Sequence, residues 1–170
     1  MLGEEERPGR EIMQVINFRL GVNEFGVDII SVKEIIRVEN ITHIPEAPSF
    51  IHGLANLRGQ IIPVIDLAMQ FGLSGADKSK EKVRILVTEF NGHTVGMLVD
   101  EVPGVLKITE DNIEPPPELI QSGLRRDYIR GVGKLEDRLI ILLNLEKVLI
   151  PHEADEAERL MDALPAGREE

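Results

Sequence analysis

The stretch Gly53-Leu54-Ala55-Asn56-Leu57-Arg58-Gly59-Gln60-Ile61-Ile62-Pro63-Val64-Ile65 consists of two apolar runs that meet at the polar pair Arg58-Gly59. Apolar runs separated by a short polar turn are typical of a β-hairpin. The residues that follow, Leu67 to Phe71, predict a short helical turn that ends at Gly72. The sequence therefore predicts a hairpin followed by one turn of helix.

The pattern around the hairpin recurs later in the chain. A shift of 78 positions matches Ile51, Gly53, Leu57, Ile61, Asp66 and Leu67 to Ile129, Gly131, Leu135, Leu139, Asn144 and Leu145. A shift of 70 positions matches Gly26-Val27-Asp28-Ile29 and Val32 to Gly96-Met97-Leu98-Val99 and Val102. The two shifts differ by about eight residues, which we place around Gln121 to Asp127 of the second copy.

Two copies of a strand-rich unit predict an all-β protein with a few short helices. One copy alone would bury too little of its surface, so we expect two small barrels packed around a shared hydrophobic core. The polar residues 1–13 predict a flexible N-terminal arm, and residues 14–150 hold both copies. Residues 151–170 form a tail whose apolar residues stand at helical spacing, which would allow a final helix.

Composition limits the classes of partner. The formal net charge of −11 would repel phosphate backbones and anionic lipid, which argues against nucleic acid and membrane surfaces. The chain has no cysteine, which excludes disulfides and thiolate chemistry. The acidic N-terminus lacks the apolar segment of a secretory signal, and no apolar run is long enough to span a bilayer. We therefore expect a cytoplasmic protein.

No catalytic, cofactor or metal site is predicted. The four histidines do not stand at metal-ligand spacing, and glycine-rich phosphate loops and nucleophile elbows are absent. Asp66 and Asp100 each follow an apolar strand, and a small barrel enzyme could use them as a pair of acids. The simpler interpretation is that each carboxylate accepts backbone hydrogen bonds at a strand end.

The hairpin sequence resembles the signature of the CheW family, the coupling proteins of bacterial chemotaxis. The resemblance extends over residues 14 to 150 and includes Phe25-Gly26-Val27-Asp28-Ile29, Val95-Gly96-Met97-Leu98-Val99-Asp100-Glu101-Val102 and Tyr128-Ile129-Arg130-Gly131-Val132-Gly133. It implies two five-stranded SH3-like β-barrel subdomains. It also implies a non-catalytic, cofactor-free scaffold that couples chemoreceptors (methyl-accepting chemotaxis proteins) to the chemotaxis histidine kinase CheA.

Two alternatives stay open within the same class of binding proteins. The chain could serve a chemosensory pathway for pili or surface sensing, or it could be a detached kinase regulatory domain. We expect the isolated protein to be monomeric.

The resemblance also assigns contact residues. The receptor-contact set comprises Val32, Glu34, Asn56, Arg58, Gly59, Val102 and Val105. The kinase-contact set comprises Ile41, Gly53, Glu118 and Leu119. Within the first set, Val102 and Val105 would line the side of a groove opposite Arg58. Glu114 departs from the basic residue of some family members, which argues against a salt bridge at that edge.

The two proline-marked edges, residues 45–48 and 115–118, are equivalent in the two copies. They should lie at opposite ends of a pseudo-symmetric molecule, so a partner built from the same repeat can join head to tail. The groove between the barrels then stays free for an amphipathic receptor helix.

Arg58 has two interpretations. It could be a solvated turn charge that pairs with a nearby carboxylate, or a guanidinium fork held for a partner. The equivalent segment of the second copy, Lys134-Leu135-Glu136-Asp137, keeps the leucine but loses the Arg-Gly pair. The fold therefore does not need Arg58, which favours a partner-facing role.

Overall fold

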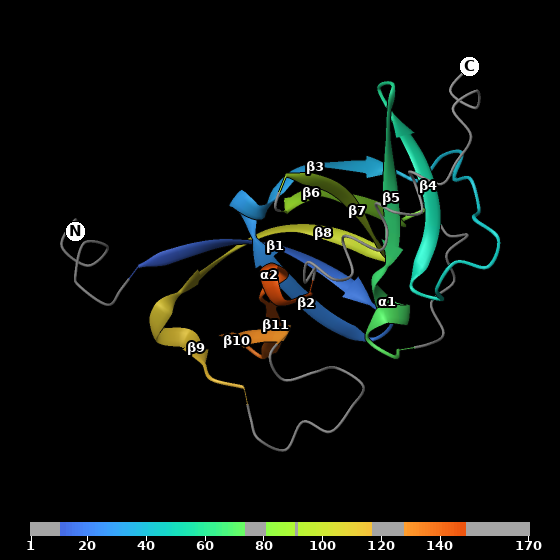
Figure 1. Cartoon of the computed structure of the whole chain (residues 1–170). Coiled ribbons are helices and arrows are strands. Elements are labelled where there is room, and N and C mark those ends of the chain that lie inside the picture. Colours follow the sequence, from blue (N-terminus) through green and yellow to red (C-terminus); the bar gives the residue numbers. More distant parts are fainter. Residues whose placement is uncertain (1–10, 74–80, 91, 117–127, 149–170) are drawn as a thin grey trace.

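Alternating apolar residues form two β-sheets in the computed structural model, which describes residues 11–73, 81–90, 92–116 and 128–148 (Figure 1). The first sheet has the strand order β8 (Glu101–Thr109), β1 (Ile12–Leu20), β2 (Asn23–Asp28), β11 (Arg138–Leu143), β10 (Ile129–Leu135) and β9 (Ile113–Glu114). The second has the order β3 (Val32–Arg37), β6 (Arg84–Phe90), β7 (His93–Val99), β5 (Gln60–Asp66) and β4 (Ile51–Leu57).

Helical segments are short. Single turns of α-helix follow β5 and β11: α1 spans Leu67–Gln70 and α2 spans Leu145–Val148. The 3-10 turns η2 (Ile29–Ser31) and η3 (Glu110–Asn112) follow β2 and β8. The predicted hairpin and its helical turn are confirmed. β1 begins at Ile12, inside the segment expected to be an arm.

The internal repeat is confirmed by the element bounds. A shift of 78 carries β4 onto β10 and α1 onto α2, residue for residue. The pairing is equivalent as well: in parallel pairs, Val64 of β5 lies beside Gly96 of β7, and Leu142 of β11 lies beside Gly26 of β2. Each sheet therefore contains strands of both sequence halves.

The expectation of two five-stranded SH3-like barrels is corrected in three respects. The first sheet has six strands, because Ile113–Glu114 pairs with β10 as β9, whereas its counterpart in the second sheet is the single bridge Thr42–Leu54. Among the described strands, neither sheet closes by hydrogen bonding into a barrel. Nor does either sheet correspond to one copy of the repeat, because the halves exchange strands.

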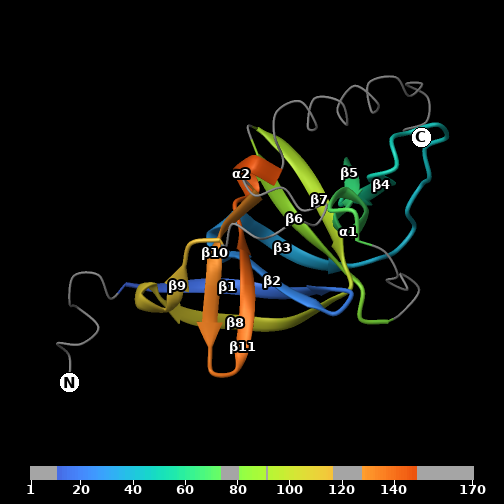
Figure 2. The ribbon, with the colours of Figure 1, turned by 90° about the horizontal axis from the view of Figure 1, so that it is seen from below.

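The buried apolar side chains form three clusters, of which one joins the two sheets. The central core lies between the sheets and includes a row of rings, Phe18, Phe25, Phe71 and Tyr128, with neighbouring centroids 5.6 to 5.8 Å apart. A smaller cluster lies inside the curve of each sheet. In the first sheet, β10 and β11 cross over β1 and β8 (Figure 2). A Cβ on Gly133 of β10 would meet Ile108 of β8 at 3.0 Å.

A charge placed at Val64 should unfold the protein. Val64 is fully buried in the second sheet's own cluster, so Val64→Asp would bury an uncompensated carboxylate there. We expect a loss of about 4 kcal/mol or more in the free energy of unfolding, measured by urea denaturation. Val22→Asp is the control, because Val22 is 93% exposed and should change stability little. Equal stability of the two variants would contradict the assigned facing of β5.

Candidate partner-binding surfaces

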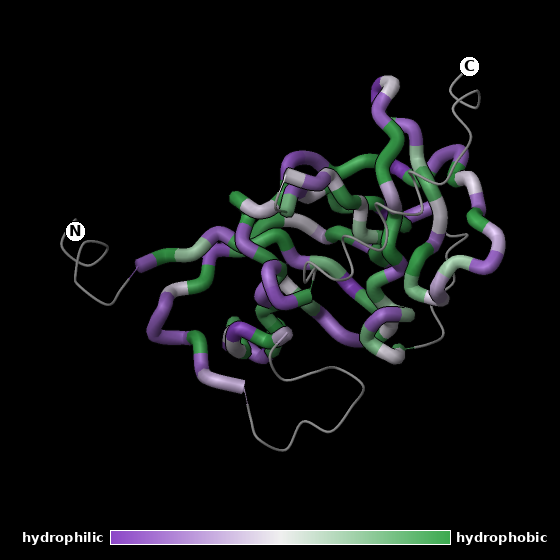
Figure 3. The backbone as a smooth tube through the Cα atoms, viewed as in Figure 1, coloured by the Kyte–Doolittle hydropathy of each residue, from purple (hydrophilic) through white to green (hydrophobic). Residues whose placement is uncertain are grey.

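The turn between β4 and β5 is a tight hairpin tip. Arg58 and Gly59 both have positive φ, 51° and 87°, as type I′ turns require. The side-chain oxygen of Asn56 accepts a hydrogen bond from the backbone N–H of Gly59 at 2.8 Å. The equivalent turn between β10 and β11 has Glu136 at φ 56°. The turn therefore forms without arginine, and the tip is hydrophilic (Figure 3).

Arg58 forms a bidentate ion pair with Glu34. Its Nη1 donates to Oε1 of Glu34 at 3.2 Å, and its Nη2 donates to Oε2. Glu34 lies on β3 and Arg58 at the tip of β4 and β5, while β3 and β4 are the two edges of the second sheet. The pair therefore bridges the open seam of that sheet. The Arg58 side chain stays 70% exposed, so the pair holds the guanidinium in place while much of it still faces solvent.

The pairing shifts both titrations in the direction of the charged forms. The hydrogen bond from Arg58 lowers the pKa of Glu34 below its ordinary value, and the bond to Glu34 raises the pKa of Arg58. The spacing of 24 residues between the two side chains gives no local sequence signal for this pair.

A second feature lies on the face of β3 that borders the central core. Ile35 pairs with Leu86 of β6, so the two side chains share a face, and Leu86 belongs to the central core. Val32 also packs against this core, while Ile35 stays 40% exposed at its margin. We call Val32 and Ile35 the β3 strip.

An equivalent strip lies on β8. Val102 packs against the central core, and Val105, 50% exposed, pairs with the core residue Ile16. We call Val102 and Val105 the β8 strip. Sequence reasoning missed Ile35, although the shift of 70 that matches Val32 to Val102 also matches Ile35 to Val105.

The predicted receptor contacts thus fall into two groups. Val32, Val102 and Val105 border the central core. Glu34 belongs to the second group: it pairs in register with Val87 of the second sheet's own cluster and so lies on the opposite face of β3. The other members of this group, Asn56, Arg58 and Gly59, lie at the seam. A bulge between Val32 and Glu34 separates the two groups by resetting the alternation of β3.

The predicted kinase contacts of the first copy lie together at the edge of β4. Gly53 is buried, and a Cβ there would lie 2.5 Å from the carbonyl oxygen of Thr42 and 2.6 Å from Cγ2 of Ile41. Gly53 therefore lets the Ile41–Thr42 segment lie directly over β4. In the second copy, Gly131 admits Ile113 and Glu114 in the same way, because a Cβ on Gly131 would lie 2.9 Å from an atom of each.

The second predicted kinase edge is only partly visible. Glu118 and Leu119 lie outside the described residues, as do the extra residues placed at 121–127. Glu114 does form a salt bridge at this edge, contrary to expectation: its Oε2 lies 2.7 Å from Nζ of Lys134 on β10. The partner is a lysine of the same chain, which the departure from the family pattern did not indicate.

Asp66 and Asp100 hold the backbone. Asp66 caps α1 by accepting a hydrogen bond from the N–H of Met69 at 3.2 Å. Asp100 accepts from the N–H of Gly21 at 2.6 Å. These contacts fit the simpler interpretation of strand-end carboxylates.

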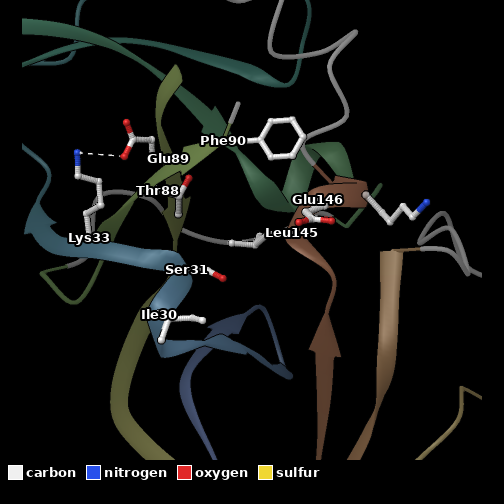
Figure 4. Close-up of a pocket in the computed structure, with 9 residues that line it drawn as sticks. Ile30, Ser31, Lys33, Thr88, Glu89, Phe90, Leu145 and Glu146 are labelled. Atoms are coloured by element: carbon white, nitrogen blue, oxygen red, sulfur yellow. Dashed lines mark ion pairs between the residues drawn. The ribbon is translucent and has the colours of Figure 1, made fainter. Parts of the chain in front are cut away.

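The cavities do not bring the two aspartates together either. A cavity of about 640 Å³ lies between η2, β6 and α2, where Glu89 pairs with Lys33 at 3.7 Å (Figure 4). Neither Asp66 nor Asp100 lines this cavity or the two smaller ones, of about 370 and 240 Å³, in the described part of the chain. The described residues also contain no group of three or more His, Cys, Asp or Glu that could hold a metal ion.

Comparison with known proteins now identifies the family. The CheW-like domain matches residues 14–151. The chain belongs to the CheW family. It is 40% identical over 136 residues to the chemotaxis protein CheW of Klebsiella aerogenes, covering 80% of this chain and 81% of that protein. It is 33% identical to CheW of Helicobacter pylori, covering 86% and 87%.

A solved structure of the CheW family agrees with the fold. The scaffolding protein TtCheW of Thermoanaerobacter tengcongensis superposes with a TM-score of 0.74 at 36% identity, covering 87% of this chain and 93% of that one. The two-sheet arrangement is therefore shared with a CheW scaffold. Within the described residues, no helix is long and apolar enough to cross a membrane.

The Glu34–Arg58 pair should be visible in a titration. We expect the Glu34 carboxyl, followed by NMR, to titrate below the ordinary glutamate range and to return to it in Arg58→Ala. Because folding depresses this pKa, the contribution to stability is present above the unfolded pKa and is lost as the pH falls through the folded pKa. A Glu34 midpoint that is the same in both proteins would contradict the pairing.

A methyl group at Gly53 should displace the Ile41–Thr42 segment. We expect Gly53→Ala to lower the free energy of unfolding by about 1 to 3 kcal/mol, because the closest contact is with the backbone carbonyl oxygen of Thr42, which cannot relax locally. Gly104→Ala is the control, because a Cβ at Gly104 meets nothing within 4 Å. Thermal denaturation of both variants decides the matter, and a stable Gly53→Ala protein would refute the close approach.

Proposed function

We propose that this CheW-family protein is a non-catalytic scaffold that couples chemoreceptors to the chemotaxis histidine kinase CheA. The observation that carries the proposal is family membership over residues 14–151 together with a similar CheW scaffold structure. Relatives of matching length are named chemotaxis protein CheW. We assign both binding activities to residues 14–150.

The proposed receptor surface combines the β3 and β8 strips with the seam at Glu34 and Arg58. Exposed apolar side chains such as Ile35 and Val105 suit the apolar face of an amphipathic helix. Arg58, at the seam on the opposite face of β3, is mostly exposed and adds charged donors to this surface. The strips are short, which suits a contact that must rearrange during signalling.

The proposed kinase surface lies at the edge formed by Ile41 and Thr42 over Gly53. This edge borders β4, which faces β3 across the seam, whereas the β3 strip lies on the other face of β3, at the central core. A kinase domain bound there would leave the β3 strip open to a receptor. The equivalent edge at Ile113–Glu114, with Glu118 and Leu119 beyond it in sequence, offers a second contact for head-to-tail assembly.

Reconstitution tests the proposal directly. The protein would be mixed with CheA and with receptor cytoplasmic fragments in membrane-mimicking assemblies, and co-sedimentation and kinase activity would be measured. We expect both partners to co-sediment only when the protein is present. Absence of either partner from the pellet would overturn the scaffold function.

Arg58→Ala should weaken this coupling without unfolding the protein. The side chain is mostly exposed and the equivalent turn forms without arginine, so folding should persist by circular dichroism. Arg130→Ala is the matched control, because Arg130 is also exposed and ion-paired, with Asp28 at 3.9 Å. If both variants support receptor-dependent kinase activity equally, Arg58 has no part in the contact.

A further inference from the structure

Two arginines lie next to each other just beyond the β3 strip. Arg37 of β3 and Arg84 of β6 pair directly in register, so two guanidinium groups stand on adjacent strands. Like charges directly opposite each other destabilise a sheet. In a chain of net charge −11, this concentration of positive charge calls for a reason beyond the fold.

Both arginines share the face of Ile35. The pairs Ile35–Leu86 and Arg37–Arg84 are two residues apart on their strands, so their side chains lie on the same side of the second sheet. On that side, Leu86 and Val99 belong to the central core, and Arg84 stands opposite Val99 of β7. The arginines therefore continue the β3 strip outward from its apolar part.

Among the residues that the structure describes, no acidic side chain neutralises this pair. The Arg37 side chain is exposed and makes no ion pair or hydrogen bond within the described part of the chain. Nη1 of Arg84 donates to the carbonyl oxygens of Glu81 and Val83, at 2.7 and 2.9 Å, and no carboxylate of the described residues pairs with it. The nearby Glu101 is bound by Arg19 at 3.7 Å and Lys82 at 3.8 Å.

On β8, too, the apolar strip is followed by a positively charged side chain. Lys107, which matches Arg37 under the shift of 70, follows Val105 by two residues and is exposed. In each strip, an exposed β-branched residue is thus followed at about 6.6 Å by a cation. An α-helix repeats a side-chain position every four residues, over about 6 Å, so a helix lying along the strand can match this spacing.

We propose that Arg37, with Arg84 beside it, binds a carboxylate of the receptor helix, placed one helical turn beyond the apolar residue that contacts Ile35. This inference rests on the proposed function and specifies the chemistry of the partner: an amphipathic helix with an acidic residue next to its apolar face. Charge complementarity selects that occupant, since the overall acidity of the protein would otherwise repel it.

The test uses the full chain and a soluble receptor cytoplasmic-tip fragment, with affinity measured by calorimetry at about 50 mM and about 300 mM NaCl. We expect Arg37→Gln to bind about 2- to 5-fold more weakly at low salt, and the difference to vanish at high salt. Lys134→Gln is the control: it removes one positive charge from an exposed lysine of the first sheet. Arg37→Glu should bind more weakly still, and reversal of one acidic residue of the fragment to Lys should restore its affinity.

The possible outcomes distinguish failure of the proposed function from failure of the role of Arg37. If the wild-type protein does not bind the fragment, the proposed function fails and this inference fails with it. If the wild type binds, Ile35→Asp abolishes binding, and Arg37→Gln behaves like Lys134→Gln at low salt, only the role of Arg37 is overturned. Binding of the wild type to phosphatidylserine vesicles that is lost in Arg37→Gln would assign the cations to lipid headgroups and would also overturn it.

Discussion

The whole structure depends on burying one apolar face between two sheets that exchange strands. The parallel pairs β5–β7 and β11–β2 join the two sequence halves inside each sheet, and the ring row from Phe18 to Tyr128 fills the space between the sheets. A half taken alone would lack the central strands of its own sheet. The edges that remain, β3, β4, β8 and β9, are therefore the places where the molecule can present distinct surfaces.

Because of the repeat, equivalent positions at these edges can be compared, and the positions that differ point to function. Gly53 and Gly131 solve the same packing problem, as do Arg58 and Glu136 in their turns. Where equivalent positions agree, the fold alone explains the residue found there. Where they differ, as with the ion pair of Arg58 to Glu34, a requirement beyond the fold is indicated.

Local features of the fold were predictable from the sequence, and pairing between distant strands was not. The hairpin around Arg58-Gly59 and the helical turn after Asp66 follow from alternation and stop signals over a few residues. The exchange of strands does not, because β2 and β7 have the same apolar pattern and either could lie beside β5. The same limit hid the sixth strand β9, which is only two residues long.

In the candidate site, too, local features were predictable from the sequence and contacts between distant residues were not. Arg58 was identifiable as a turn residue, but its partner Glu34 lies 24 positions away. The facing of Ile35 was hidden by the bulge before Glu34, which breaks strict alternation on β3.

The exchange of strands also determines how the protein can be made. Phe25 of β2 lies beside Ile141 of β11, so the first strands to leave the ribosome await a partner from near the end of the chain. Until then, β2 and β5 have open edges with the same pattern, and each can pair with the corresponding strand of another nascent chain. A high concentration of unfinished chains and slow completion of each one therefore favour strand-swapped dimers, and rapid completion of one chain favours the monomeric fold.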